Sequence, residues 1–381
     1  MVASALSVGV EEEFMLVHPS AAHLRPCGPA VIEAAGRMGV RLYKELTTAQ
    51  VETNTPVCWN IRDLSRELRE LRSVAAAAAT GAGARLIAAG ATVAGDPTTS
   101  LADSARYRRM AEEFGLLVAE HGICGCHVHV GVADRETAVQ VGNHLRPWLP
   151  TLLALTANSA VHSGRDTGYA SWRSILQSRW PCSGPPPYFT SADHYDSVVA
   201  MMLDAGAALD HGMVYWDVRP SAHMPTIEIR VSDIPSTVDQ TVLLAGLVRG
   251  LVGTAIRALD SGRTAAAVSA EVLRAAYWRS ARDGLRGTAV DPFTLRRTTL
   301  PALLAALLRH IGAELEDRGE LHEVTSLAGK VLSLGNGAIH QRRALSRRGA
   351  VADVVDQAAR ATVDDLGVPP GAMTPHPHRP Q

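Results

Sequence analysis

The sequence predicts an α+β fold in which an antiparallel or mixed sheet carries helices packed on one side. Three observations predict it. Short strand-like runs recur between residues 7 and 231, helical patterns are spread along the whole chain, and the two kinds of segment do not alternate regularly. A doubly wound parallel sheet requires a strand–helix–strand rhythm, so a mainly antiparallel sheet with a one-sided helical layer fits better.

The individual elements follow from local patterns. A helix begins at about Asn60, whose side chain can cap it, and continues to about Thr80 with Leu64, Leu68 and Leu71 on one stripe. The strand-like runs cover residues 7–17, 49–55, 84–92, 125–132, 213–218 and 225–231. Further helices are predicted over 103–120, 134–160, 193–209 and 237–260, followed by an almost entirely helical stretch over 265–362.

The domain organisation is predicted to be simple. We expect residues 1–364 to form a single catalytic domain with a largely helical C-terminal third, because the clearest break, SGPPPY at 183–188, is typical of a proline-stiffened loop and not of a linker between halves. Residues 365–381, which end in TPHPHRPQ, are expected to form a disordered tail.

The charge balance excludes several classes of partner. The 381 residues include 37 basic and 38 acidic side chains, for a net charge of −1 and a pI near 7.0. Such a chain lacks the long-range attraction that drives binding to nucleic acids or anionic membranes. Its most apolar run, residues 241–256, is interrupted by Arg249, and no run reaches the roughly 18 apolar residues of a membrane span. We expect no nucleic-acid partner and no membrane partner.

The cysteines and the N-terminus predict the compartment. Five cysteines stand at scattered positions, whereas a disulfide framework usually has an even and denser set. Three acidic residues occur by position 13 without a basic leader, so we expect no signal peptide. Both observations favour a cytoplasmic protein with reduced thiols.

Four of the strand-like runs share one design. Because side chains two positions apart on a strand point to the same face, each run has an apolar face and a polar face. A half-solvated sheet is also polar on one face, but its polar residues are usually a mixture of Thr, Ser, Lys and Gln. Here the four runs together indicate one shared site. The polar pairs are Glu11 with Glu13, Glu52 with Asn54, His127 with His129, and Glu228 with Arg230.

The residue types of these pairs indicate divalent ions and phosphate. Converging carboxylates repel one another and take up protons unless a cation neutralises them. Carboxylate oxygens with one or two imidazoles suit Mg²⁺ or Mn²⁺, and an arginine on the same face suits the phosphates of a nucleotide such as ATP. The chain has no GxxxxGK[ST] phosphate loop. The CGCHVH run is a poor structural zinc site, because strand alternation places Cys126 opposite both histidines.

With these strands, the sequence resembles the carboxylate–amine ligases of the glutamate–cysteine ligase family, in its shorter bacterial branch. The resemblance implies a curved, mainly antiparallel sheet of the glutamine synthetase and guanido kinase catalytic type, with helices on its convex side. ATP and divalent ions would bind in its concave face. The matching segments, which span positions 9 to about 343, are GVEEEFMLV, ELTTAQVETNTPV, GCHVHVGV, ALTANSAVHSGRDTGYASWR, WDVRP, TIEIRVSD, YWRSARDGL and GNGAIHQRR.

The resemblance also implies roles for individual residues. Arg230 would be the catalytic arginine and, with Arg219, would contact phosphate. For Arg173 and Arg219 a surface position is an equal alternative. For His129, a structural role in its strand is an equal alternative. For Trp216, a position in the core is an equal alternative. The implied metal ligands are Glu11, Glu13, Glu45, Glu52, His127 and Glu228. The expected substrate contacts are Arg173, His129, Asn54 and Trp216.

The function that follows is ATP-dependent amide formation. We expect ATP to phosphorylate a carboxylate and an amine to attack the resulting acyl phosphate. The expected substrates are small molecules, an amino acid and an amine. The expected oligomeric state is a homodimer. γ-Glutamylcysteine synthesis is a finer expectation, because the longer family members carry insertions that shape the glutamate and cysteine pockets. Two alternatives stay open. A metal-dependent amidohydrolase built on His127 and His129 predicts hydrolysis without ATP, and a non-catalytic relative predicts ATP binding without ADP formation.

Overall fold

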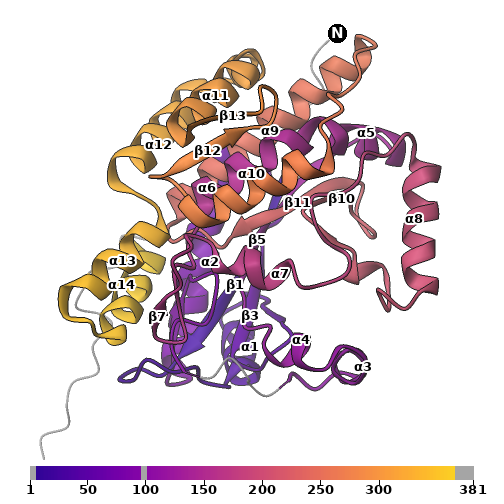
Figure 1. The fold of residues 1–381 in the computed structure, drawn as a ribbon. Coiled ribbons are helices and arrows are strands. Elements are labelled where there is room, and N and C mark those ends of the chain that lie inside the picture. The colour runs from indigo at the N-terminus through magenta and orange to yellow at the C-terminus, as the bar shows by residue number, and fades with distance from the viewer. Residues whose placement is uncertain (1–5, 96–100, 365–381) are drawn as a thin grey trace, which may run out of the picture.

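The computed structural model describes residues 6–95 and 101–364. Within them, seven strands form one antiparallel sheet in the order β10-β11-β5-β1-β3-β2, with β4 paired to β1 (Figure 1). Its strands are β1 (Val8–Val17), β2 (Tyr43–Lys44), β3 (Gln50–Asn54), β4 (Arg85–Ile87), β5 (Gly125–Gly131), β10 (Val218–Pro220) and β11 (Thr226–Asp233). The predicted α+β class and antiparallel sheet are confirmed.

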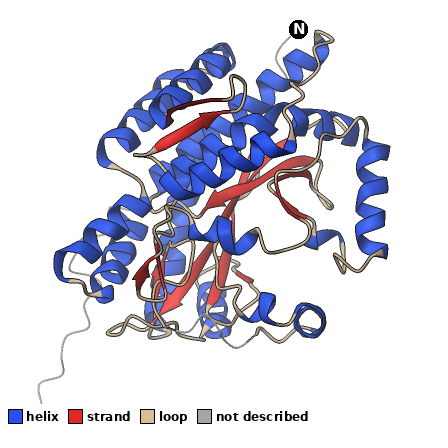
Figure 2. Ribbon diagram, in the orientation of Figure 1, coloured by secondary structure: helices blue, strands red, loops and turns tan. Residues whose placement is uncertain are grey.

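Helices cover the apolar face of this sheet. α2 (Ile61–Gly81) and α9 (Val238–Asp260) pack against Val10 of β1 and Val128 of β5 in the largest hydrophobic core (Figure 2). As predicted, the side chain of Asn60 caps α2 by accepting a hydrogen bond of 2.8 Å from the backbone N–H of Asp63. The burial of this face leaves the opposite face, which carries the acids and histidines, for the site.

α9 is long and apolar enough, by length and composition, to cross a membrane. However, 78% of its most apolar window is buried inside the fold, where it packs among α2, α5, α11 and α12. A core helix passes the same test of length and composition, so this helix is weak evidence for a membrane span.

The remaining helices surround the sheet, and α10 to α14 make up most of the C-terminal third (Figure 1). They are α1 (Gly28–Arg37), α3 (Ala105–Phe114), α4 (Leu116–Ala119), α5 (Arg135–Leu145), α6 (Leu149–Thr156), α7 (Trp172–Gln177), α8 (Ala192–Asp204), α10 (Ala270–Asp283), α11 (Leu300–Asp317), α12 (Leu321–Leu334), α13 (Gly337–Arg348) and α14 (Val351–Val363). Short 3₁₀ turns cover 146–148 and 211–213, and two-residue strands form the pairs β6 (Val161–His162) with β7 (Arg165–Asp166) and β8 (Ser183–Gly184) with β9 (Tyr215–Trp216).

Two predicted helices are divided. The segment predicted over 134–160 forms α5 and α6 with a 3₁₀ turn between them, because Pro147 has no N–H to continue the α-helical ladder. The segment predicted over 103–120 breaks at Gly115, whose φ of 53° is a conformation that favours glycine.

The prediction of a continuous helical stretch over 265–362 was wrong at one place. β12 (Thr288–Asp291) and β13 (Arg296–Thr299) form an antiparallel hairpin between α10 and α11. Threonines and Val290 favour strands, and the Asp291–Pro292 turn interrupts any helix. The predicted tail, 365–381, lies outside the described residues.

One acid of β1 faces the helices instead of the site. Glu12 is fully buried and forms a two-point ion pair with Arg72 of α2, at 2.5 Å to Nη2 and 2.9 Å to Nε. Thr241 of α9 donates a further hydrogen bond of 2.7 Å to the Glu12 carboxylate. The pair ties β1 to both helices, and strand alternation therefore turns Glu11 and Glu13 to the opposite face.

Candidate active site

The register of the sheet places the polar residues opposite one another. Glu13 pairs with Glu52 across β1 and β3, and Glu11 pairs with His127 across β1 and β5. Glu228 of β11 lies between His129 on one neighbouring strand and Arg219 on the other. Each of these pairs faces the same side of the sheet. Strands distant in the sequence are thus joined into one polar surface, as the four-strand pattern predicted.

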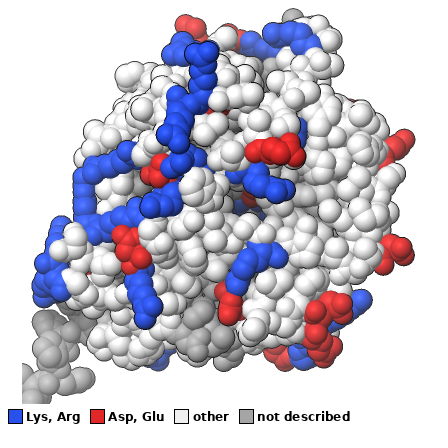
Figure 3. Space-filling model, in the orientation of Figure 1, with Lys and Arg blue, Asp and Glu red and all other residues white. Residues whose placement is uncertain are grey.

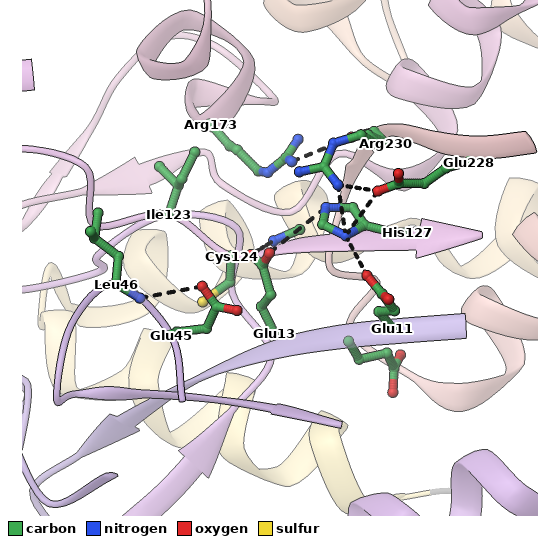
Figure 4. Close-up of polar contacts among 12 residues, drawn as sticks. Glu11, Glu13, Glu45, Leu46, Ile123, Cys124, His127, Arg173, Glu228 and Arg230 are labelled. Atoms are coloured by element: carbon green, nitrogen blue, oxygen red, sulfur yellow. Dashed lines mark hydrogen bonds and ion pairs between the residues drawn. The ribbon is translucent and has the colours of Figure 1, made fainter. Parts of the chain in front are cut away.

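This surface forms the floor of a cavity of about 340 Å³. Helix α3, the loop before β3 and the loop between β10 and β11 contribute to its walls. Figure 4 shows the labelled carboxylates, His127 and the two arginines turned toward one another. The lining residues predicted from the sequence are Glu11, Glu13, Glu45, Glu52, His127, His129, Arg173, Arg219, Glu228 and Arg230.

Two groups of side chains in this cavity could each hold a divalent ion. The acidic group consists of Glu13, Glu45 and Glu52, and the mixed group of Glu11, His129 and Glu228. In each group one ligand atom from every member lies within 4.8 Å of the others. Carboxylate oxygens with one imidazole nitrogen are the donors that Mg²⁺ or Mn²⁺ takes, so the residues present fit such ions.

The acidic group would carry uncompensated charge if all its carboxyls were ionised. Burial, and then repulsion from Glu13, raise the pKa of Glu45 to about 7. Burial, and then repulsion from Glu45, raise the pKa of Glu52 well above its usual value. These carboxyls hold protons that a cation would displace, and a bound cation would remove the repulsion.

The mixed group is neutralised by its neighbours. Burial alone would raise the pKa of Glu11, but the hydrogen bond with His127 and the contact with His129 outweigh it and lower the pKa. Burial likewise opposes ionisation of Glu228, but Arg230 and Arg219 hold the pKa of this carboxyl well below its usual value. Both acids of this group are therefore ionised at neutral pH.

The two histidines of β5 have different surroundings. His127 lies between the groups, with Nδ1 3.0 Å from Glu11 Oε2 and Nε2 3.7 Å from Glu13 Oε1. Burial and Arg230 lower the pKa of His127, so its ring is neutral. His129 Nδ1 contacts Thr226 Oγ1 at 2.9 Å, while its buried Nε2 makes no hydrogen bond with any described residue and lies 3.4 Å from Glu11 Oε1. Geometry thus makes His129, predicted as a substrate contact, a second candidate ligand beside His127.

The arginines of the cavity differ in how they are paired. Arg230 and Arg219 both form ion pairs with Glu228, Arg219 at 2.8 Å. Arg173 instead donates from Nη2 to the backbone carbonyl of Arg230 at 3.3 Å, and its buried Nε has no partner among the described residues. A buried guanidinium without a carboxylate partner is suited to an anionic ligand.

A buried polar network positions Arg173 at the start of α7. Asp233 accepts hydrogen bonds from Ser159 Oγ and Ser171 Oγ, both 2.7 Å, and Ser159 Oγ accepts one of 2.9 Å from the backbone N–H of Arg173. The guanidinium then lies over Gly125, where a Cβ atom would come within 2.5 Å of Nη2. Glycine at position 125 therefore leaves the space that Arg173 occupies.

Two predicted substrate contacts do not line this cavity. Trp216 is buried in an aromatic cluster with Phe189 and Tyr195, at ring-centroid distances of 5.2 and 5.4 Å. Its placement matches the core alternative. Asn54 lies beside Glu11 in the β1–β3 register, and its buried Oδ1 makes no hydrogen bond with any described residue.

Sequence reasoning missed residues that reach the cavity from outside the sheet. Arg106 and Tyr107 come from α3, and Arg106 forms an ion pair with Asp210 at 2.7 Å. His121 also lines the cavity, and burial lowers its pKa to about 3, with Trp180 Nε1 3.0 Å from its Nδ1. No strand alternation or motif marks these residues, so the sequence held no signal for them.

The amidohydrolase alternative finds little support in this geometry. Within residues 6–95 and 101–364, the two groups able to hold an ion contain one histidine in total, His129. A hydrolytic transition-metal site would use more imidazole ligands. The donor set is instead dominated by carboxylates.

Comparison with known proteins gives consistent similarities. The sequence model of the family "Glutamate-cysteine ligase family 2" matches residues 7–357 of this chain. A Nocardia farcinica protein named "Putative glutamate--cysteine ligase 2-1" is 52% identical over 370 residues, which cover 96% of both chains. A Mycolicibacterium smegmatis protein named "Putative glutamate--cysteine ligase 2-3" is 50% identical over 357 residues, which cover 93% of this chain and 98% of that one.

Solved structures share the fold. The glutamate–cysteine ligase of Francisella tularensis, crystallised with AMP, matches with a TM-score of 0.68 at 14% identity, over 97% of this chain and 91% of that one. The bifunctional glutathione synthetase of Pasteurella multocida matches with a TM-score of 0.63 at 14% identity, over 95% of this chain and 52% of that one.

Proposed function

The chain belongs to glutamate–cysteine ligase family 2, and on this premise we propose that its cavity joins the carboxylate of one amino acid to the amine of another. The protein is an ATP-dependent carboxylate–amine ligase. The observation that carries the assignment of the site is the convergence of two ion-binding groups with Arg173, Arg219 and Arg230 in one cavity. Such a set is suited to a polyphosphate and an anionic substrate.

The reaction needs an activated carboxylate, because oxide is a poor leaving group. Transfer of the γ-phosphoryl group of ATP to the carboxylate gives an acyl phosphate and ADP. The amine nitrogen then forms a bond to the acyl carbon, the bond from that carbon to the phosphate oxygen breaks, and phosphate leaves. The amine proton passes to solvent.

In this scheme each part of the cavity has one task. The acidic and mixed groups would hold Mg²⁺ or Mn²⁺, which neutralise the phosphates and the donor carboxylate when bound. His127, neutral and between the groups, would complete either ligand set. Arg230 would hold the oxygens of the transferring phosphoryl group, and Arg219 the phosphates of ATP.

Glutamate as the donor and cysteine as the acceptor are the pair we propose. The names of the relatives and of the family support it. A buried arginine without a carboxylate partner, Arg173, supports an amino acid ligand.

We also propose a cytoplasmic location and a homodimer. The five cysteines form no disulfide, which suits a reducing compartment. Leu332 and Leu334 of α12 are exposed apolar side chains that a second copy could cover. Light scattering with size-exclusion chromatography tests the oligomeric state.

The function is tested by following ADP release with Mg²⁺, ATP, L-glutamate and L-cysteine. We expect release to require both amino acids. Arg230→Ala should slow it by roughly 10²–10⁴, as expected for loss of a group that stabilises transition-state charge. The exposed Arg37→Ala is the matched control and should keep full activity. Near wild-type turnover in Arg230→Ala would remove the proposed role of Arg230.

A further inference from the structure

A histidine outside the sheet lines the catalytic cavity without belonging to its ion-binding groups. His121 lies in the turn between α4 and β5, and its side chain borders the same cavity as the carboxylates of β1 and β3. Neither of the two groups of described residues that could hold a divalent ion includes it. Its own contacts indicate a different task.

The hydrogen bond from Trp180 determines which ring nitrogen of His121 carries a proton. An indole Nε1–H can only donate, so the His121 Nδ1 atom, 3.0 Å from it, must be the acceptor. An imidazole whose Nδ1 accepts has its proton on Nε2, whereas a charged ring has protons on both nitrogens and could not accept this bond. Burial, and then the charge of Arg173, lower the pKa of His121 to about 3, which agrees with a neutral ring.

Aromatic packing holds the ring of His121 in one orientation. Trp180 lies edge-on to it, with ring centroids 5.1 Å apart, and itself packs against Phe114 and Tyr215 at 5.2 and 5.4 Å. Trp180 is buried and does not belong to the described lining of the cavity. The edge of the His121 ring that faces the cavity is therefore the edge away from Trp180, which carries the Nε2–H. This donor makes no hydrogen bond with another described residue.

Arg173 supplies a second donor group close to His121. It lines the same cavity, and after burial its charge is the largest influence on the pKa of His121, so the guanidinium lies near the ring. Figure 3 shows basic side chains spread over one face of the molecule, where water surrounds them. Arg173 differs from these, because it is only 5% exposed and its Nε has no partner among the described residues. Buried donors of this kind cost free energy unless a ligand or water satisfies them.

These two donors suit a carboxylate better than a phosphate. A carboxylate has one negative charge and two oxygens, which one guanidinium and one directed N–H can satisfy. A triphosphate carries several charges, for which the cavity offers the ion-binding groups together with Arg219 and Arg230. The imidazole of His121 is neutral, so it adds a direction for hydrogen bonding without adding a second positive charge.

We propose that the Nε2–H of His121 donates a hydrogen bond to a substrate carboxylate whose charge Arg173 balances, and that Trp180 is the positioning residue of this donor. The inference rests on the proposed ligase function. The carboxylate is one that does not react, because the reacting carboxylate must lie against the ions and the phosphates of ATP. Glutamate and cysteine each keep one such carboxylate, and the experiment distinguishes them.

Three variants separate a donated hydrogen bond from a structural role. His121→Leu removes the donor, His121→Gln keeps a side-chain N–H, and Trp180→Phe keeps an aromatic ring but removes the N–H that holds Nδ1. His322→Leu, at an exposed histidine of α12 outside the cavity, is the matched control. The KM values for ATP, L-glutamate and L-cysteine and the kcat are measured from ADP release, and the thermal unfolding of each variant is recorded.

A second set of assays identifies the amino acid that carries the carboxylate. Hydroxylamine, which has no carboxylate, replaces cysteine and intercepts the acyl phosphate as a hydroxamate. If His121 holds glutamate, the KM for glutamate rises in the His121→Leu variant with either nucleophile. If His121 holds cysteine, the KM for cysteine rises, and hydroxamate formation keeps its wild-type kinetics.

We expect His121→Leu to raise the KM for one amino acid at least about tenfold, as for the loss of a hydrogen bond to a charged group, while kcat and the KM for ATP change less than about threefold. Trp180→Phe should raise the same KM at least about threefold, and His121→Gln should keep it within about threefold of the wild type. Unchanged KM values in His121→Leu, or an equal loss in His121→Leu and His121→Gln, overturn the inference. A rise of the KM for ATP alone also overturns it. If the wild type releases no ADP and forms no hydroxamate, the proposed function itself fails.

Discussion

Removing one negative charge from the acidic group should raise the stability of the metal-free protein. It should also reduce the stability that the protein gains when Mg²⁺ binds. The carboxylate oxygens of Glu13, Glu45 and Glu52 lie within 4.8 Å of one another. Two unit charges at that separation repel by about 3 kcal/mol at an effective dielectric constant of about 20. The rise in the pKa of Glu45 from 4.5 to about 7, caused by burial and then by Glu13, corresponds to about the same free energy.

The sign of the effect follows from linkage. A carboxyl whose pKa is higher in the folded than in the unfolded state destabilises the fold at pH values above the unfolded pKa. This cost in free energy grows with pH until the pH passes the folded pKa. In Glu45→Gln this cost disappears. At pH 8 without metal, the variant should therefore unfold with a free energy about 2–3 kcal/mol higher than the wild type, and at pH 5 with a difference below about 1 kcal/mol.

Thermal unfolding in EDTA and in Mg²⁺ measures this reversal. At pH 8 in EDTA, Glu45→Gln should melt several degrees above the wild type. In Mg²⁺ the wild type should gain stability and the variant should gain much less, because one anionic ligand is missing. Glu33→Gln, an exposed carboxylate on α1, is the control and should leave both melting temperatures unchanged. Equal melting temperatures in EDTA, or equal stabilisation by Mg²⁺, would refute the reasoning.

Three further predictions concern the fold, the position of Arg173 and ion binding. Arg72→Met should lower the free energy of unfolding in urea by about 3–5 kcal/mol, because Glu12 is then left buried without its cation, and adding Glu12→Leu should restore most of the loss. A double variant no more stable than the single one would contradict this. Gly125→Ala should displace the guanidinium of Arg173 and raise the KM for an amino acid substrate at least fivefold, whereas Gly36→Ala, with open space around it, should not. Calorimetry in buffers of different ionisation enthalpy should show that protons are released when Mg²⁺ binds near pH 7. The affinity for Mg²⁺ should rise with pH, because the carboxyls of the acidic group whose pKa is raised must ionise before they bind the ion. Binding without proton release would count against that assignment.

The sheet and the face that carries the site were predictable because strand alternation is a strong local rule. Once β1 buries Val10 and Phe14, Glu11 and Glu13 must point to the other face, and the same rule orients His127 and Glu228. Even the buried Glu12 obeys it, although its partner Arg72 lies 60 residues away on a helix.

The parts that the sequence did not predict depend on packing between distant elements. Tyr107 reaches the cavity from α3, a helix outside the sheet, and no local pattern encodes this placement. Whether His127 or His129 completes the mixed group depends on side-chain rotamers and on the contact with Thr226. The core position of Trp216 follows from its aromatic neighbours, which come from separate segments.

Two divalent ions are proposed to bind in one cavity of this sheet. A crystal of the protein with Mn²⁺ and a non-hydrolysable ATP analogue, recorded for the anomalous signal of manganese, tests it most directly. We predict one peak among Glu13, Glu45 and Glu52 and a second beside Glu11 and Glu228, with the phosphates between them and Arg230. Manganese peaks outside this cavity, or none within it, would contradict the account.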